Sequence, residues 1–262
     1  MNDFDLITSA QNPRIKQLLA LQQKSSERRS SGLFVVEGQR ELSHCMAAGY
    51  EVAALYVCPE LCPMDFDLPD ASVVHVSPQL YERIAYRGST EGVVALIREK
   101  RLTLSNLDLT GSPLIVVLES VEKPGNLGAI LRSADAAGAT AVVVCDPLTD
   151  LNNPNLIRAS IGARFTVPCV ATTSQECIAW LQQHGISILT AQLQDSCPYY
   201  QTDMRRPTAI VMGTESTGLT QAWREAATAH IRIPMLGRLD SLNVSVSAAI
   251  LLFEAVRQRQ SQ

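Results

Sequence analysis

Apolar runs separated by helical stretches dominate the chain beyond residue 113. The runs are four or five residues long and lack polar alternation, which is typical of strands buried on both faces. Helices are expected after Asn126 and near residues 174–184, between these strands. The pattern therefore predicts a parallel sheet covered by helices on both sides. The runs are LIVVL at 114–118, AVVVC at 141–145, ISIL at 186–189 and AIVM at 209–212.

A different pattern precedes this region. From Leu33 to about Arg98, short apolar runs alternate with amphipathic stretches such as Glu41 to Gly49, which predicts a small α/β domain. The mostly polar segment 99–113 ends in a GSP break and is typical of a linker. We therefore expect an α/β protein with a first domain over residues 1–105 and a second over 111–262.

Charge modifies this picture only locally. The chain has 22 Lys and Arg against 26 Asp and Glu, a net charge of -4, which argues against a histone-like nucleic-acid binder. Residues 1–32 reverse the sign, with five basic and three acidic side chains. Leucines at helical spacing predict a helix there, followed by a polar connector. Such a helix is either simply solvated or a contact for a polyanion.

The scattered cysteines and the lack of long apolar runs suggest the cytoplasm as the compartment. The chain start has no signal-peptide pattern and no run approaches eighteen apolar residues, so we expect a soluble cytoplasmic protein. The seven scattered cysteines contain no C-x-x-C pair, which suits a reducing environment. Cys58 and Cys62 could join His44 or His75 around zinc. The rest of a ligand set is missing, so no metal is expected.

Ligands of open parallel sheets bind beyond the carboxyl ends of the strands, so the segments that follow the runs matter most. After LIVVL, Asn126 is expected to cap a helix that Gly138 ends. Arg132 falls opposite the apolar stripe of that helix, where it faces solvent, a partner subunit or a ligand. Only Gly125 and Gly128 are present, so the dinucleotide-binding fingerprint is absent.

Two later segments carry further candidate chemistry. In IVMGTESTGL, Gly213 and Gly218 flank Glu215, and the glycines permit either a simple turn or close approach of a ligand. In IRIPMLGRLDSLNVSVSAAILLFEAV, Ser241 and Asn243 stand at the head of a helix that is apolar almost all round. Those polar side chains serve either helix capping or a ligand.

Taken in this order, the three segments resemble the SpoU/TrmH family of the SPOUT superfamily of RNA 2′-O-ribose methyltransferases. The resemblance covers about residues 111–258, and a further stretch, RASIGA at 158–163, is also similar to the family. The first half is similar to the substrate-binding domain of many members, through LFVVEGQREL and GVVALI. The matching positions are Asn126, Gly128, Arg132 and Gly138; Gly213, Glu215 and Gly218; and Ile233, Pro234, Met235 and Ser241 to Ser245.

The resemblance implies a carboxy-terminal trefoil knot, which ordinary topology rules would not propose. It also implies a homodimer packed through the knot region. The cofactor would be S-adenosyl-L-methionine, bound in a bent form in the knot. The positions implied to bind it are Thr190, Ala191, Met212, Gly213, Ile233, Met235, Leu242 and Val244.

The catalytic residues implied by the resemblance are Arg132, Asn126, Glu215, Ser241 and Asn243. A guanidinium is a poor base, so we expect Arg132 to bind the RNA phosphate and stabilise the developing alkoxide. Asn126 and Glu215 would hold Arg132. Ser241 and Asn243 would orient the ribose or the arginine.

The substrate implied is RNA, and the amino-terminal domain favours ribosomal RNA over transfer RNA. Phosphate contacts are expected from Arg14, Lys16, Arg28, Arg29, Arg158 and Arg164. One alternative is a transfer-RNA ribose methyltransferase. Another is a catalytically silent RNA-binding factor of ribosome assembly on the same fold. Base methylation and a dinucleotide-dependent oxidoreductase are weaker alternatives.

Overall fold

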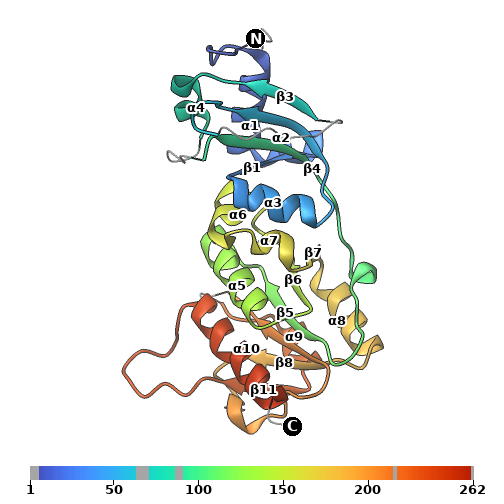
Figure 1. Ribbon diagram of the computed structural model, residues 1–262. Coiled ribbons are helices and arrows are strands. Elements are labelled where there is room, and N and C mark those ends of the chain that lie inside the picture. The colour runs from blue at the N-terminus through green and yellow to red at the C-terminus, as the bar shows by residue number, and fades with distance from the viewer. Residues whose placement is uncertain (1–5, 63–70, 86–90, 215–216, 261–262) are drawn as a thin grey trace. The chain divides into compact units, whose positions relative to one another are not determined.

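The chain forms two compact units, each with its own sheet (Figure 1). The computed structural model describes residues 6–62, 71–85, 91–214 and 217–260. The first unit comprises Met1–Lys100 together with Asp150–Thr166, and the second comprises Arg101–Thr149 and Val167–Gln262. The segment Asp150–Thr166 thus belongs to the first unit, whereas the sequence pattern assigned it to the domain 111–262.

The first unit has a four-stranded sheet in the order β1-β4-β2-β3. Its strands are β1 (Leu33–Glu37), β2 (Val52–Val57), β3 (Ser72–His75) and β4 (Val93–Arg98). Strand β4 is antiparallel to both β1 and β2, and β2 is parallel to β3. Successive side chains enter different apolar clusters, because they point to opposite faces of a strand. Val35 lies in one cluster and Phe34 and Val36 in the other.

Helices cover both faces of this sheet. The cluster that contains Val35 also holds side chains of α1 (Pro13–Gln23) and α4 (Pro78–Ile84). The other cluster holds side chains of α3 (Gln39–Ala47), α6 (Pro154–Ser160) and α7 (Ala163–Thr166). Helix α2 (Ser25–Ser31) follows α1 directly. Both faces are therefore buried, and the mixture of helices and strands is the small α/β domain predicted from the sequence.

Aromatic packing explains why the segment Asp150–Thr166 joins the first unit. The Phe165 ring stacks on Phe34 at 6.3 Å between centroids and meets the Tyr50 ring edge-on at 5.4 Å. Ile157 is buried in the same cluster. The apolar contacts of this segment thus complete a core that residues 1–100 leave open on one side.

The second unit has a seven-stranded sheet in the order β7-β6-β5-β10-β8-β11-β9, with every recorded pairing parallel. This confirms the parallel sheet predicted from the apolar runs. The strands are β5 (Leu114–Glu119), β6 (Ala141–Cys145), β7 (Cys169–Thr172), β8 (Ser187–Ala191), β9 (Cys197–Pro198), β10 (Thr208–Met212) and β11 (Ala229–Arg232).

Two pairs of helices pack on this sheet. Side chains of α8 (Ser174–Gln183) and α9 (Gln221–Ala226) share a buried cluster with the strands. Helix α5 (Pro124–Ala136) packs against α10 (Val244–Gln260) on the other side (Figure 1). Short 3₁₀ turns occupy Leu104–Asn106 and Tyr199–Gln201.

The boundaries of α5 correct one expectation and confirm another. The helix begins at Pro124 with Lys123 at the cap position, so the prediction that Asn126 caps it is wrong. Proline suits a first helical position because its missing N–H would be unpaired there. Gly138 has φ of +63°, which confirms it as the stop.

Candidate functional site

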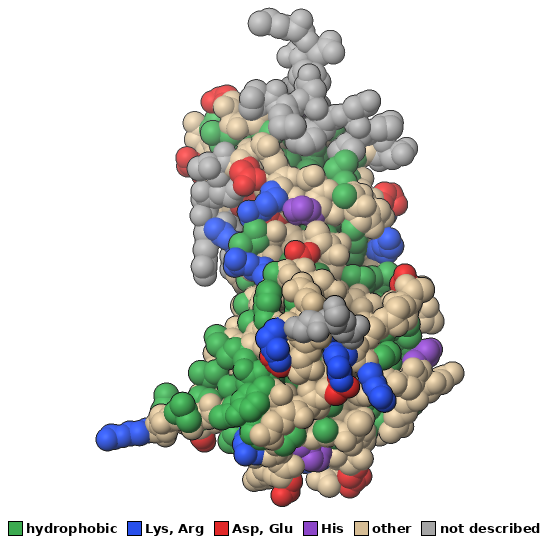
Figure 2. All heavy atoms as spheres, turned by 60° about the horizontal axis from the view of Figure 1, so that its bottom comes forward, with side chains coloured by type: hydrophobic (Ala, Val, Ile, Leu, Met, Phe, Trp, Pro, Cys, Tyr) green, Lys and Arg blue, Asp and Glu red, His purple; other side chains and the backbone are tan. Residues whose placement is uncertain are grey.

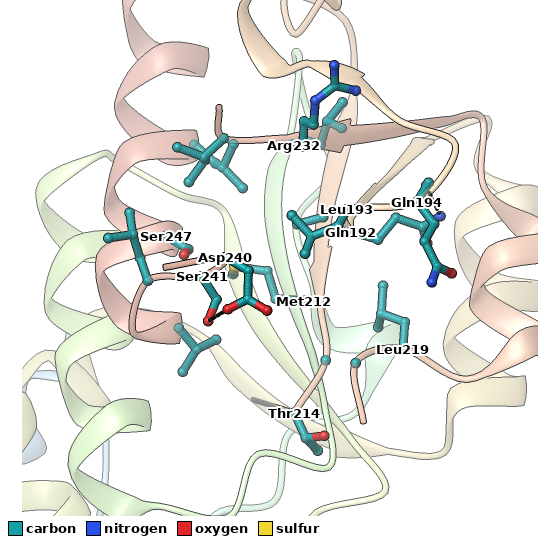
Figure 3. Close-up of a pocket in the computed structure, with 18 of the residues that line it drawn as sticks. Gln192, Leu193, Gln194, Met212, Thr214, Leu219, Arg232, Asp240, Ser241 and Ser247 are labelled. Atoms are coloured by element: carbon teal, nitrogen blue, oxygen red, sulfur yellow. Dashed lines mark hydrogen bonds between the residues drawn. The ribbon is translucent and has the colours of Figure 1, made fainter. Parts of the chain in front are cut away.

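A pocket of about 450 Å³ opens at the carboxyl ends of β8, β10 and β11 (Figure 3). Its walls come from the segments that follow these three strands and from the first turns of α10. This is the edge where parallel sheets bind ligands. The volume falls in the range of pockets for small organic ligands.

The loop after β10 begins with Gly213, where the backbone leaves no room for a side chain. A Cβ on Gly213 would lie 2.3 Å from the carbonyl oxygen of Gly218, and Thr214 bridges back to Gly218. Gly218 has φ of +69°, a conformation that favours glycine. The Thr217 N–H donates to Thr214 Oγ1 at 3.0 Å. The two glycines therefore shape a tight loop whose backbone forms one wall of the pocket.

Most of the positions expected to bind the cofactor line this pocket. They are Ala191, Met212, Gly213, Ile233, Met235, Leu242 and Val244. Thr190 is the exception. It is fully buried, its hydroxyl lies 2.6 Å from His230 Nδ1, and it does not line the pocket. The prediction fails there because β8 turns Thr190 into the sheet interior and presents the following residues.

Three polar side chains of the pocket were not predicted from the sequence. Gln192, Arg224 and Asp240 all belong to the lining. Buried Nε of Arg224 and buried Oε1 of Gln192 have no hydrogen-bond partner. Unpaired buried polar atoms are rare, and a ligand is a usual reason for them. The pocket therefore suits a ligand that carries both an acceptor and a donor. No sequence motif identifies Gln192 and Arg224, because what distinguishes them is a buried polar atom without a partner, which only the structure shows.

A second hollow of about 150 Å³ adjoins the pocket and shares Gly213, Thr214 and Val244 with it. Asn126 lines this hollow, and its Oδ1 accepts a hydrogen bond of 3.1 Å from Asn243 Nδ2. The structure thus brings the first and third motifs together beside the pocket.

Ser241 lines the main pocket near Asp240, with 3.4 Å between Ser241 Oγ and Asp240 Oδ1 (Figure 3). It stands on the opposite side of the pocket from Gln192 and Gln194. Asn243 Oδ1 accepts from the backbone N–H and the hydroxyl of Ser245. Asn243 therefore caps α10, and its side-chain amide nitrogen also donates to Asn126 of the first motif.

Arg132 is exposed on α5, as its spacing predicts. Within the described ranges its guanidinium has no recorded hydrogen bond or ion pair, so the expected contact with Asn126 is not formed. The two positions are six residues apart, which is about 9 Å along the axis and about 240° around it, so they lie on different faces of the helix. Glu215, the other expected partner, lies outside the described residues.

A buried carboxylate, that of Glu119, is hydrogen-bonded to the residue that follows the pocket loop. Glu119, at the end of β5, is 3% exposed and accepts hydrogen bonds from the Thr220 N–H at 2.8 Å and hydroxyl at 2.7 Å. Ser174 Oγ lies 3.2 Å from Glu119 Oε1 and 2.6 Å from Asp146 Oδ2. Thr220 directly follows the pocket loop, so Glu119 fixes the end of that loop to β5.

The adjoining Cys145 thiol is buried as well. A hydrogen bond with Cys177 and then burial raise the pKa of the Cys145 thiol. Charged neighbours of the same sign act in the same direction. The Cys145 thiol therefore stays protonated.

Four of the six side chains expected to contact RNA are exposed, namely Arg14, Lys16, Arg29 and Arg158. All four belong to the first unit. Arg14 also lines a polar hollow of about 460 Å³ in that unit. The exposed side chains remain candidates for phosphate contacts.

The other two, Arg28 and Arg164, are each 5% exposed, and for them the prediction is wrong. Arg28 Nε pairs with Asp150 Oδ2 at 2.6 Å, and its Nη1 donates to the Leu21 carbonyl at 2.6 Å. Arg164 donates to the Leu151 carbonyl at 3.2 Å and to the Tyr50 hydroxyl at 3.3 Å. Their donors are occupied inside the first unit, so they are not presented to a polyanion.

Neither a membrane span nor a metal cluster is found in the part of the chain that the structure describes. No helix there combines the length and apolar character needed to cross a bilayer. No group of three or more His, Cys, Asp or Glu side chains there is arranged to hold a metal ion. Cys58 and Cys62 are buried free thiols.

Comparison with known proteins adds two family matches. A family model described as "SpoU rRNA Methylase family" matches residues 113–253. A second, described as "MRM3-like substrate binding domain", matches residues 12–95.

Individual proteins extend the likeness over nearly the whole chain. A 23S rRNA (guanosine-2′-O-)-methyltransferase of Ralstonia nicotianae is 38% identical over 72% of this chain and 80% of its own length. A 23S rRNA (uridine(2479)-2′-O)-methyltransferase of Streptomyces viridochromogenes is 29% identical over 97% and 92%. The crystal structure of an AdoMet-bound rRNA methyltransferase from Sinorhizobium meliloti superposes with a TM-score of 0.89 at 28% identity, covering 97% of this chain and 98% of the other.

Proposed function

This chain belongs to the SpoU rRNA methylase family, and we propose that it transfers a methyl group from S-adenosylmethionine to a ribose 2′-hydroxyl of ribosomal RNA. The observation that carries the proposal is the pocket at the ends of β8, β10 and β11. It is lined by the segments expected to bind the cofactor, and the Asn126–Asn243 pair lies beside it. Curated relatives of this chain are named for 2′-O-methylation of 23S rRNA, on guanosine in one case and uridine in another.

The pocket residues fit the cofactor chemically. Apolar side chains such as Ile233 and Leu242 would pack on the adenosine, and the Gly213 backbone would approach it closely. When bound, S-adenosylmethionine supplies an electrophilic methyl group on a cationic sulfur. The residues beside the pocket would hold the ribose hydroxyl toward that methyl group, and the hydroxyl proton would pass to solvent as the oxygen becomes methylated. The chain's main contribution is alignment of these atoms, which can supply several kcal/mol.

The polar side chains beside the pocket would act on the ribose. Ser241 and Asn243 would orient its hydroxyl, with Asn126 holding the amide of Asn243. Glu215 would contribute from the same loop as Gly213. Arg132 would bind the neighbouring phosphate and stabilise the developing alkoxide, because a guanidinium keeps its charge at all relevant pH values. Arg132 is exposed on α5. The RNA would therefore have to lie across α5 to place its ribose oxygen near Arg132, or a second copy of the chain would have to supply the arginine.

The RNA would be held by Arg14, Lys16, Arg29 and Arg158 on the first unit. These exposed cations give affinity for phosphates without sequence choice. Specificity would come from the shape of the RNA against this unit. The family match over residues 12–95 supports a substrate-binding role for it.

The finer features of the fold belong to the same proposal. The carboxy-terminal strands would form a trefoil knot, consistent with the adjacent loops that converge on the pocket. The chain would form a homodimer through this region. Figure 2 shows apolar side chains gathered on a face of the second unit. Exposed apolar side chains of this unit include Leu236 at 99%, Val246 at 46% and Phe253 at 48%. A cytoplasmic location stays a prediction.

The test is transfer of labelled methyl groups to ribosomal RNA, with the product nucleosides identified by mass spectrometry. We expect a 2′-O-methylated nucleoside with the wild-type chain and its loss with Arg132→Ala, Arg132→Lys and Asn243→Ala. Arg205→Ala is the matched control, because Arg205 pairs with Asp203 on the surface away from the pocket. Near-normal turnover of Arg132→Ala would remove Arg132 from the mechanism.

Three further outcomes would change the proposal itself. A methylated base in place of a methylated ribose would contradict the reaction. Calorimetry with S-adenosylmethionine separates an enzyme from a silent assembly factor, because a scaffold need not retain cofactor affinity. Mapping of 2′-O-methyl sites in cells with and without the protein would identify the target nucleotide, and loss of a transfer-RNA site alone would favour that alternative.

A further inference from the structure

Two side chains of the pocket lining, Arg224 and Gln192, each have a buried polar atom without a hydrogen-bond partner. Arg224, on α9, lines the pocket, and its buried Nε has no hydrogen-bond partner. No ion pair is recorded for its guanidinium in the described part of the chain. Two other arginines of the second unit, Arg205 and Arg257, each pair with a carboxylate. A half-buried cation without a counter-ion is costly unless a ligand supplies one.

Gln192 supplies the complementary group. Its Nε2 donates to the Gln194 carbonyl at 2.9 Å, which fixes the orientation of the amide because only the nitrogen can donate to a carbonyl. The Oε1 atom is buried and accepts no hydrogen bond. It therefore offers an acceptor to an N–H group in the pocket.

The labelled polar side chains of the pocket lie on two sides of it (Figure 3). Asp240 lies with Ser241 on one side, whereas Gln192 and Gln194 lie on the other (Figure 3). The third charged side chain of the lining, Arg232, points its guanidinium away from the centre and lies 3.4 Å from Ser196 Oγ. Arg224 is thus the cation available to a bound anion.

We propose that Arg224 and Gln192 bind the amino-acid tail of the cofactor, Arg224 its α-carboxylate and Gln192 its α-ammonium group. This rests on the proposed function. The carboxylate is the only anionic group of S-adenosylmethionine, and a charge-assisted hydrogen bond to a guanidinium is stronger than one to a ring nitrogen of adenine. The sulfonium would then lie toward Asp240 and Ser241, where its positive charge meets the acid.

The experiment compares two ligands that differ only in the carboxylate, namely S-adenosylhomocysteine and its decarboxylated analogue, by titration calorimetry. Wild-type protein should bind the decarboxylated ligand about 10- to 100-fold more weakly, the factor expected for one charge-assisted hydrogen bond. Arg224→Gln should bind S-adenosylhomocysteine more weakly by the same factor and should no longer distinguish the two ligands. Such a cycle isolates the pairwise interaction from other effects of the substitution.

Further variants keep the test decisive. Arg224→Lys, which retains charge and most of the side-chain packing, should lose less discrimination than Arg224→Gln. Gln192→Leu should weaken both ligands by an equal factor of a few-fold, because both keep the ammonium group. Arg205→Gln, the matched control, should behave as wild type, since Arg205 lies outside the pocket lining.

Three results would overturn the assignment. One is equal binding of both ligands by the wild-type chain. Another is an equal loss for both ligands in Arg224→Gln, which would place Arg224 on the adenosine half. The third is unchanged binding of S-adenosylhomocysteine by that variant. If the wild-type chain binds neither ligand, the proposed function itself fails, which is a distinguishable outcome.

Discussion

Buried charge serves different purposes in the two units. In the first, the buried guanidinium groups of Arg28 and Arg164 join parts of the chain that are far apart in sequence, through Asp150 and Tyr50. In the second, the buried carboxylate of Glu119 receives the N–H and hydroxyl of Thr220 at the end of the pocket loop. The first arrangement stabilises the architecture of a unit, whereas the second shapes a site. All three groups are buried, so the comparison shows that the partners of a buried charged residue decide which role it has.

The largest effect is expected for Arg28→Ala, which leaves the partly buried Asp150 without its cation. Breaking a buried ion pair from one side costs about 3–5 kcal/mol, so the free energy of unfolding of the first unit should fall by that amount. Urea titration followed by Tyr fluorescence measures it. The exposed neighbour Arg29→Ala is the control, with a change within about 0.5 kcal/mol. Equal effects would mean that the buried pair has no architectural role.

Gly213→Ala should act mainly on the site. The new Cβ would lie 2.3 Å from the Gly218 oxygen, so the loop must move. We expect a loss of about 1–3 kcal/mol in stability, as for other overpacked positions, and at least about a tenfold loss of cofactor affinity. Calorimetry measures the binding. Gly125→Ala is the control because a Cβ there meets nothing within 4 Å. Wild-type affinity in Gly213→Ala would show that the pocket tolerates a displaced loop.

Glu119→Gln tests whether the second buried charge shapes the site. The amide keeps the volume but places an N–H where Thr220 or Ser174 donates, which should cost about 1–3 kcal/mol of stability. Because the loop end loses an anchor, cofactor affinity should also fall. Thermal unfolding and calorimetry report the two effects. Glu225→Gln, on the exposed side of α9, serves as control. A stability loss with unchanged affinity would make Glu119 purely architectural.

The smallest effect on stability is expected for the exposed cations of the first unit. Lys16→Ala should leave the free energy of unfolding within about 0.5 kcal/mol of wild type. It should weaken RNA binding uniformly across sequences and reduce the slope of log affinity against log salt by about 1. Filter binding at several salt concentrations measures this slope. If the slope is unchanged, this face does not contact the phosphates.

Hydrophobic periodicity predicted the architecture well but not the roles of single polar residues. The runs at 114–118 and 209–212 became the neighbouring strands β5 and β10, because residues buried on both faces leave a direct trace in sequence. Arg28 and Arg164 looked like surface cations, since composition does not show which arginine finds an internal partner. The segment Asp150–Thr166 joined the first unit through Phe165, a long-range contact that no local pattern encodes.

The backbone features of the candidate site could be predicted from the sequence, whereas its polar side-chain contacts could be predicted only in part. Gly213 and Gly218 mark a tight loop because Gly213 has no room for a side chain and Gly218 has a positive φ that favours glycine. Arg224 could not be singled out, because its importance arises from an unpaired atom and not from a motif. The contact expected between Asn126 and Arg132 failed because helix geometry separates them.

The discontinuous first unit has a consequence for protein synthesis. Phe34 and Leu42 belong to a cluster that is completed by Ile157 and Phe165. A ribosome adds about 5–20 residues per second, so this face of the sheet stays uncovered for several seconds after the strands of the first unit have been made. During that interval β5, α5 and β6 also emerge. The first unit therefore completes its core only after part of the second has been translated.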